Sequence, residues 1–149
     1  MYLYRNFRPE DLEGIMDLVS FNLGEYYPRS LYLEKSREWE DGFIVCVDNT
    51  SGRVIGMLLG SHEGRNETRV LMLAVDSRNR RKGIGTELMT RFIDLSIKKG
   101  ARRVTLEVRV SNEGAKSFYR KLGFYQNGVL SMYYSNYEDG IRMVKDLQT

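Results

Sequence analysis

Hydrophobic positions along this chain follow two periods, and together they predict about seven strands and about four helices. Alternation from Tyr2 to Phe7 is typical of an edge strand. Pro9-Glu10-Asp11 is a helix start, and the apolar residues at 12, 15, 16 and 19 follow it at helical spacing. The other predicted elements are a helix over 30–40, a hairpin of 43–48 and 53–61, a strand over 70–75, a helix over 84–100, a strand over 104–110, a helix over 115–122, and strands over 124–130 and 141–147. This order predicts an α+β (mixed α/β) fold, with one mixed sheet flanked by helices.

Composition places the chain among ordinary globular domains. Its 149 residues, 42% hydrophobic and 29% charged, predict a single domain over 1–149. No apolar run approaches the length of a membrane span and the first residues lack a signal-peptide core, so we expect no membrane partner. Cys46 is the lone cysteine, so an internal disulfide is excluded, which fits a reducing, cytoplasmic location. We expect Cys46 to be buried and to act as a small hydrophobic residue. The net charge of +3 is too mild to indicate a nucleic-acid partner.

The segment Arg80-Arg81-Lys82-Gly83-Ile84-Gly85 lies between a predicted strand and a predicted helix. Free N–H groups and the helix dipole favour an anion at a helix N-terminus, and glycines allow close approach to phosphate oxygens. A solvated basic turn is the alternative. The segment lacks the Walker pattern, and Leu88 occupies the third glycine position of a dinucleotide fingerprint. The remaining match is Arg/Gln-x-x-Gly-x-Gly/Ala, the pyrophosphate loop of acetyl-CoA-dependent N-acetyltransferases.

Further motifs appear in order around this loop. They are Leu73-Ala74-Val75, Leu106-Glu107-Val108-Arg109-x-Ser111-Asn112 and Ala115-x-x-Phe118-Tyr119-x-x-Leu122-Gly123-Phe124. With them, the chain resembles the GNAT acetyltransferase superfamily. Within it, the chain is similar to protein N-terminal acetyltransferases of the NatA catalytic type and to ribosomal-protein alanine acetyltransferases, from Arg8-Pro9-Glu10-Asp11-Leu12 to Met143-x-Lys145-Asp146-Leu147. The resemblance implies the GNAT fold.

The resemblance also implies acetyl-CoA as cofactor and no metal. The strand segment Leu73 to Val75 would lend backbone groups to the pantetheine arm, where an N–H could stabilise a developing oxyanion. Asn112 would lie beside the pantetheine. The implied cofactor residues are Leu73, Ala74, Val75, Arg80, Arg81, Lys82, Gly83, Ile84, Gly85, Thr86, Asn112, Ala115 and Tyr119.

The implied catalytic side chains are one tyrosine and two competing carboxylates. Tyr119 would donate a hydrogen bond to the departing thiolate; packing in the core is its alternative role. Glu25 and Glu107 compete as general base for a substrate α-amine whose reference pKa is near 7.7–8.0. Glu107 would otherwise be a strand acid paired with Arg103 or Arg109, and Glu25 an exposed loop acid. NatA-type enzymes often have a histidine at this point of the sequence. This chain has Arg69 there, so a histidine base is excluded at that position.

Four tyrosines, Tyr26, Tyr27, Tyr133 and Tyr134, resemble those that narrow the peptide slot, although packing or hairpin pairing would also explain them. The implied function is acetyl transfer to protein or peptide N-termini by direct attack in a ternary complex. An auxiliary subunit is left open but not implied. A lysine or small-molecule acceptor, a non-catalytic CoA-binding module and a nucleic-acid binder using residues 78–82 are the alternatives.

Overall fold

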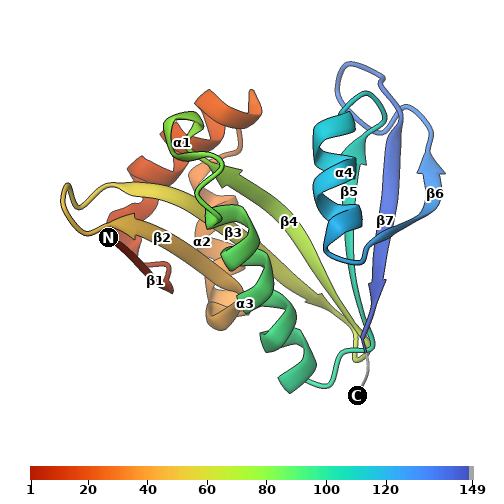
Figure 1. The fold of residues 1–149 in the computed structure, drawn as a ribbon, viewed down its shortest axis with the longest axis horizontal. Coiled ribbons are helices and arrows are strands. Elements are labelled where there is room, and N and C mark those ends of the chain that lie inside the picture. The colour runs from red at the N-terminus through yellow and green to blue at the C-terminus, as the bar shows by residue number, and fades with distance from the viewer. Residues whose placement is uncertain (148–149) are drawn as a thin grey trace. The chain divides into compact units, whose positions relative to one another are not determined.

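The computed structural model describes residues 1–147, which form seven strands and four α-helices joined by short 3₁₀ turns (Figure 1). The strands are β1 (Tyr2–Asn6), β2 (Phe43–Asp48), β3 (Val54–Glu63), β4 (Glu67–Val75), β5 (Arg103–Arg109), β6 (Tyr125–Leu130) and β7 (Gly140–Asp146). The helices are α1 (Leu12–Leu23), α2 (Arg29–Glu38), α3 (Ile84–Lys98) and α4 (Glu113–Lys121). Both the element order and the α+β class predicted from the sequence are confirmed.

The strands join in one mixed sheet with the order β1-β2-β3-β4-β5-β7-β6. β1 lies at an edge, as its alternation predicts, and pairs antiparallel with β2. β4 and β5 pair in parallel over Glu67–Val70, which requires the crossover helix α3 between them. Within this sheet the chain divides into two compact units. Unit 1 comprises Met1–Ser61 and Leu71–Leu95, and unit 2 comprises His62–Val70 and the described residues from Ser96 onward.

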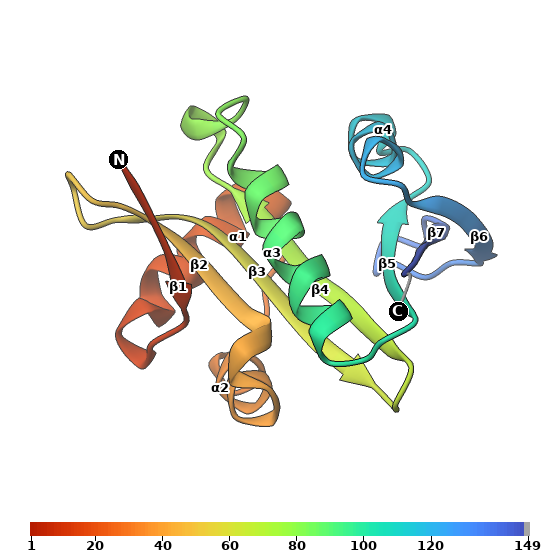
Figure 2. The same cartoon turned by 60° about the horizontal axis from the view of Figure 1, so that its bottom comes forward.

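Unit 1 has helices on both faces of its strands, as Figure 2 shows. On one face, α1 and α2 contribute buried residues such as Ile15, Val19 and Tyr32. These pack with Phe43 and Met57 from β2 and β3 in one hydrophobic cluster. The i, i+4 spacing of the α1 residues is the pattern that predicts this helix from the sequence.

The other face of unit 1 is covered by α3, which lies close to β3 because two glycines make room for it. A Cβ on Gly60 would lie 2.2 Å from Cε1 of Phe92, and one on Gly56 would lie 2.9 Å from Cγ2 of Ile84. Phe92 is fully buried and its ring centroid is 5.7 Å from that of Trp39. α3 is therefore held against the strands from its first turn, which fixes the start of the helix.

Unit 2 has one apolar sheet face and a second face that carries charged residues. Leu106 and Val108 of β5 are buried, and the register places Met143 and Ile141 of β7 opposite them on the same face. Alternation gives the other face to Glu107, whose register partner is Arg142. α4 runs alongside β5 and β7 (Figure 1). Charged side chains on a sheet face can serve as functional groups.

Several boundaries differ from those the sequence predicts. β4 begins at Glu67 rather than at residue 70, because Glu67, Thr68 and Arg69 pair with β5 although they are polar. Pro9–Asp11 forms a 3₁₀ turn, and α1 itself begins at Leu12. α2 ends at Glu38 and a second 3₁₀ turn, Glu40–Gly42, leads into β2. The single-domain prediction remains a prediction.

Candidate active site

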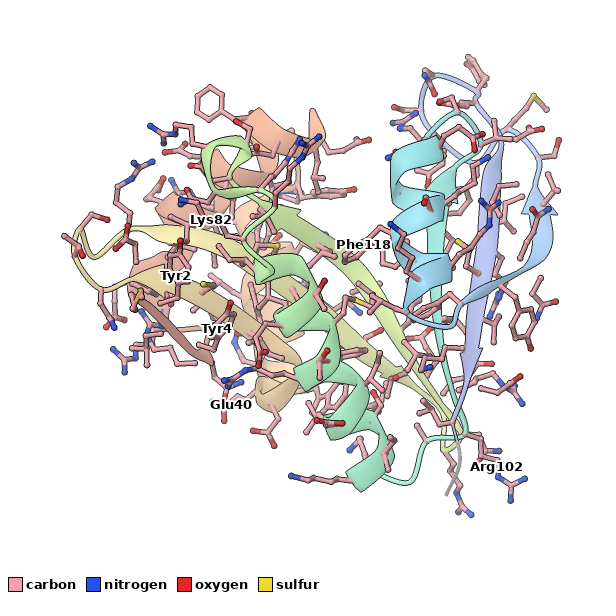
Figure 3. All side chains as sticks on the ribbon, viewed as in Figure 1. Tyr2, Tyr4, Glu40, Lys82, Arg102 and Phe118 are labelled. Atoms are coloured by element: carbon pink, nitrogen blue, oxygen red, sulfur yellow. The ribbon has the colours of Figure 1, made fainter. Side chains whose placement is uncertain are left out.

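The phosphate loop predicted from the sequence lies in unit 1 and is strongly cationic. Arg80, Arg81 and Lys82 are exposed, and within residues 1–147 none of the three forms an ion pair. Gly83 follows with φ +79°, in the left-handed region, and a Cβ there would meet no atom within 4 Å. α3 begins directly after it, with Lys82 at the turn that precedes the helix (Figure 3). Unpaired cations at the start of a 15-residue helix fit a diphosphate anion.

The backbone of this loop is held in an unusual conformation. Arg81 has φ 66°, a left-handed value that costs a residue with a Cβ about 1–2 kcal/mol. Such strain persists only where the surroundings determine it, and it often marks a functional segment. The anchoring contacts come from the preceding turn, Ser77–Asn79.

Asp76 anchors that turn. Its carboxylate accepts hydrogen bonds from the N–H of Arg78 at 2.9 Å and from the Arg78 guanidinium at 3.0 Å, and these hold the pKa of Asp76 down, at about 2. Oδ1 of Asn22 on α1 accepts the N–H of Ser77 at 3.0 Å. The path from β4 to the phosphate loop is thus fixed by side chains that the sequence reasoning missed. An aspartate directly before a turn is an N-cap signal that could have revealed Asp76.

The strand segment before the loop is less distinctive. Leu73 and Val75 are half-buried and Ala74 is 2% exposed. These side chains therefore serve the packing of unit 1. A ligand contact from this segment would have to come from the backbone, as the resemblance implies.

Glu25, Tyr26 and Tyr27 lie together in the connection between α1 and α2. Gly24, with φ +65°, ends α1 in the left-handed conformation and redirects the chain into this segment. Tyr26 is 77% exposed, whereas Tyr27 packs against the core cluster of unit 1 and Glu25 is half-buried. Burial, together with the nearness of Tyr27 and Tyr26, raises the pKa of Tyr32 to about 12. This segment therefore combines one anchored and one exposed tyrosine with a carboxylate.

Tyr119 lies on α4 in unit 2, with a buried ring and an available hydroxyl. Its ring contacts those of Phe118 and Phe124 at centroid distances of 5.1 and 5.7 Å, and the residue is 8% exposed. Among the described residues, the hydroxyl has no hydrogen-bond partner, yet it is not among the fully enclosed polar atoms. Burial, with a smaller contribution from the charge of Tyr134, raises the pKa of Tyr119 well above its usual 10. The phenol of Tyr119 therefore stays protonated at neutral pH and can donate a hydrogen bond.

Glu107 and Tyr133 are both bound by Arg69. Arg69 Nε and Nη2 donate to Oε1 of Glu107 at 2.9 and 2.7 Å, and Nη2 also donates to the Tyr133 hydroxyl at 3.0 Å. The expected partners of Glu107, Arg103 and Arg109, are wrong. Arg103 instead pairs with Glu67 and Arg109 with Glu138, because a parallel neighbouring strand brings Arg69 beside Glu107 from 38 residues away.

A second arginine holds the tyrosine-rich connection between β6 and β7. The guanidinium of Arg109 lies 4.2 Å from the ring centroid of Tyr134 and donates to Glu138 at 3.2 Å. Tyr134 in turn contacts the Tyr133 ring edge-on at 5.0 Å. Glu107, Arg69, Tyr133 and Tyr134 consequently form one connected series within unit 2, the same unit that holds Tyr119.

Asn112 caps α4, which limits what it offers a ligand. Its Oδ1 accepts the N–H of Ala115 at 3.0 Å, so the side-chain acceptor and that backbone donor satisfy each other. The Nδ2 donor of this exposed side chain takes no part in the cap and stays open to a cofactor.

Comparison with known proteins decides the family. The model of the acetyltransferase (GNAT) family matches residues 12–124. The chain belongs to the GNAT acetyltransferase family. It is 33% identical to the N-alpha-acetyltransferase of Sulfurisphaera tokodaii, covering 98% of this chain and 93% of that protein. The crystal structure of Ard1 from Thermoplasma volcanium matches with a TM-score of 0.94 and 36% identity over 99% of both chains. The NatC complex bound to Gag peptide and CoA matches with a TM-score of 0.90 and 26% identity, again over 99% of both.

As a GNAT acetyltransferase, the chain is an acetyl-CoA-dependent enzyme, and the cationic loop before α3 fits that cofactor. Residues 1–147 contain no group of three or more His, Cys, Asp or Glu side chains that could hold a metal ion. None of the helices in the described part of the chain has the length and apolar character that a bilayer span needs. Cys46 is fully buried, as predicted.

Proposed function

We propose that this chain transfers the acetyl group of acetyl-CoA to the N-terminal α-amine of proteins or peptides. The observation that carries the proposal is the connected series of Glu107, Arg69, Tyr133 and Tyr134 in unit 2, together with the Tyr119 hydroxyl of the same unit. It combines an anion, a proton donor and rigid aromatic walls. Similarity to the N-alpha-acetyltransferase of Sulfurisphaera tokodaii over 98% of the chain, and to a NatC complex bound to Gag peptide and CoA, supports the choice of acceptor.

Acetyl-CoA, when bound, supplies an activated acetyl thioester. We assign its diphosphate to the loop of unit 1, where Arg80, Arg81, Lys82, Gly83, Ile84, Gly85 and Thr86 present cations and backbone N–H groups. We assign the pantetheine arm to the backbone of Leu73, Ala74 and Val75, and to Asn112 Nδ2 and Ala115 at the start of α4.

The proposed roles of the catalytic side chains follow from their surroundings. The Tyr119 hydroxyl, whose pKa is raised by burial, would stay protonated and donate a hydrogen bond to the departing thiolate. The α-amine, with a reference pKa near 7.7–8.0, needs to lose only one proton. Glu25 and Glu107 are the carboxylates proposed to receive that proton, directly or through water.

Substrate selection is assigned to the tyrosines of two segments. Tyr133 is fixed by Arg69 and Tyr134 by Arg109, so that they would form a rigid wall against an extended peptide. Tyr26 and Tyr27 of unit 1 are proposed to take part in substrate selection as well. The acceptor is thus a peptide N-terminus in the cytoplasm, and this chain's own residues supply the proposed chemistry whether or not an auxiliary subunit joins it.

A peptide panel tests the proposal. Purified protein with acetyl-CoA is offered matched peptides with a free N-terminus, with a blocked N-terminus and one lysine, and with both blocked; mass spectrometry locates the acetyl group. Acetylation of the α-amine is expected. Acetylation confined to lysine would overturn the proposal in favour of a side-chain acceptor. CoA binding by calorimetry without turnover on any peptide would instead identify a CoA-binding module.

A further inference from the structure

The ion pair between Arg69 and Glu107 is unusual because both guanidinium donors meet one oxygen. Nε and Nη2 of Arg69 donate to Oε1 at 2.9 and 2.7 Å, and no described residue donates to Oε2. The side chain of Glu107 is 10% exposed. Thr105 Oγ1 is the sole enclosed side-chain polar atom without a partner among residues 1–147, so Oε2 retains access to solvent. Arg69 thus leaves one carboxylate oxygen available.

The same arginine reaches the peptide-side loop. Its Nη2 donates to the Tyr133 hydroxyl at 3.0 Å, while Tyr133 is 45% exposed. One cation therefore fixes both the orientation of the carboxylate and the position of a slot tyrosine. Burial lowers the pKa of Arg69, but the charge and hydrogen bonds of Glu107 outweigh it and raise that pKa above its usual value. Arg69 stays charged throughout the working pH range.

The charged groups around this pair are already matched with one another. Glu63 on β3 lies 3.9 Å from Arg69 Nη1, and Arg142 on β7, opposite Glu107, pairs with Glu67 at 3.6 Å. The other neighbouring groups are Arg103, Arg109, Tyr133, Tyr134 and Glu138. A single substitution in the pair formed by Arg69 and Glu107 would accordingly change the net charge closest to Oε2 of Glu107.

We infer that Arg69 is a positioning residue that neutralises Glu107 and aims its Oε2 at the α-amine of the acceptor. The inference rests on the proposed function. A bare carboxylate within hydrogen-bond reach would favour the ammonium form of the bound amine, which cannot attack. Balanced by Arg69, the carboxylate still accepts a hydrogen bond from the amine but does not hold it protonated. Arg69 would thus keep the bound amine reactive near neutral pH.

A double-mutant cycle on the pH profile tests this role. The kcat of the wild type, Arg69→Gln, Glu107→Gln and the double variant is measured from pH 6 to 9 with a free-N-terminus peptide. Arg69→Gln should move the acid limb up by about one pH unit, and Glu107→Gln should move it down by about one. The double variant should return close to the wild-type position. Arg103→Gln, on the same strand face, is the control and should not move the limb.

Arg69→Lys separates charge from geometry. It keeps the cation but not the two-nitrogen grip, so the acid limb should stay in place while the peptide KM rises several-fold. Shifts of the two single variants in the same direction, or no shift in either, would overturn the inference while wild-type turnover still supported the proposed function. Absence of wild-type acetylation would instead overturn the proposed function. If Arg69→Gln fails to fold by circular dichroism, an unmoved limb in Glu107→Gln is sufficient to overturn the inference.

Discussion

Removal of one oxygen from Tyr119 should separate catalysis from folding. In Tyr119→Phe the ring remains to pack against Phe118 and Phe124, whose centroids lie 5.1 and 5.7 Å away. The hydroxyl has no hydrogen-bond partner within residues 1–147, so the substitution breaks no described contact. We expect the free energy of unfolding to change by less than about 0.5 kcal/mol.

The effect on rate follows from the strength of the lost hydrogen bond. A hydrogen bond to a charged group contributes about 1.5–3 kcal/mol, and every 1.36 kcal/mol in the barrier is tenfold in rate. If Tyr119 stabilises negative charge on the departing sulfur, kcat should fall about 10- to 150-fold. Because burial raises the pKa of Tyr119 well above 10, its deprotonation should not limit the wild-type rate between pH 6 and 9.

Initial rates of CoA release, measured over a range of peptide and acetyl-CoA concentrations, check this. Tyr137→Phe is the matched control, since Tyr137 is 76% exposed in the β6–β7 connection and has no proposed role. Its kcat should match the wild type. A Tyr119→Phe enzyme that keeps more than half of the wild-type kcat, with an unchanged melting temperature, would refute the assignment of Tyr119 as hydrogen-bond donor to the departing thiolate.

Three further expectations concern the loop, the helix packing and the acid stability. Arg81→Gln and Lys82→Gln should each weaken CoA binding about tenfold or more, with a smaller salt dependence, by calorimetry at two salt concentrations; unchanged affinity in both would reject the loop assignment. Gly60→Ala should cost about 1–3 kcal/mol in urea unfolding because its Cβ would meet Phe92 at 2.2 Å, and Phe92→Leu should recover part of that loss. Burial raises the pKa of Asp11, but hydrogen bonds from Arg5 and from a backbone N–H outweigh burial and keep this pKa below its usual value. The stability that the carboxylate gives is therefore complete above about pH 5 and disappears as pH falls through the pKa of the folded state. Asp11→Asn should therefore lose about 1.5–3 kcal/mol at pH 7 and much less at pH 3; equal losses would contradict this.

Local patterns were sufficient to predict most of the fold. Helical spacing of buried residues such as Ile15 and Val19 requires no knowledge of the rest of the chain. The start of β4 was missed because Glu67 and Arg69 are charged. They form ion pairs with charged residues on the neighbouring strand β5 and do not pack in the hydrophobic core. Periodicity of hydrophobic residues cannot detect a strand of that kind.

The sequence predicted the candidate site as separate motifs. The contacts between side chains of different motifs could not be predicted. That Glu107 is a strand acid is clear from the sequence, but the identity of its partner depends on register between β4 and β5. Arg69 was noted only as the residue that replaces a histidine. Its contacts with Glu107 and Tyr133 span 38 and 64 positions, so no local rule leads to them.

The two carboxylates that sequence reasoning left in competition have different surroundings. Glu107 is one member of a close ion pair with Arg69, and that pair already occupies its Oε1. It is, however, well placed to orient an amine, because its position is fixed and one oxygen remains open. Glu25 is half-buried and lies in the connection between α1 and α2, outside any helix or strand. The contacts of Glu107 therefore favour it as the residue that orients the amine, and Glu25 stays the proposed proton acceptor.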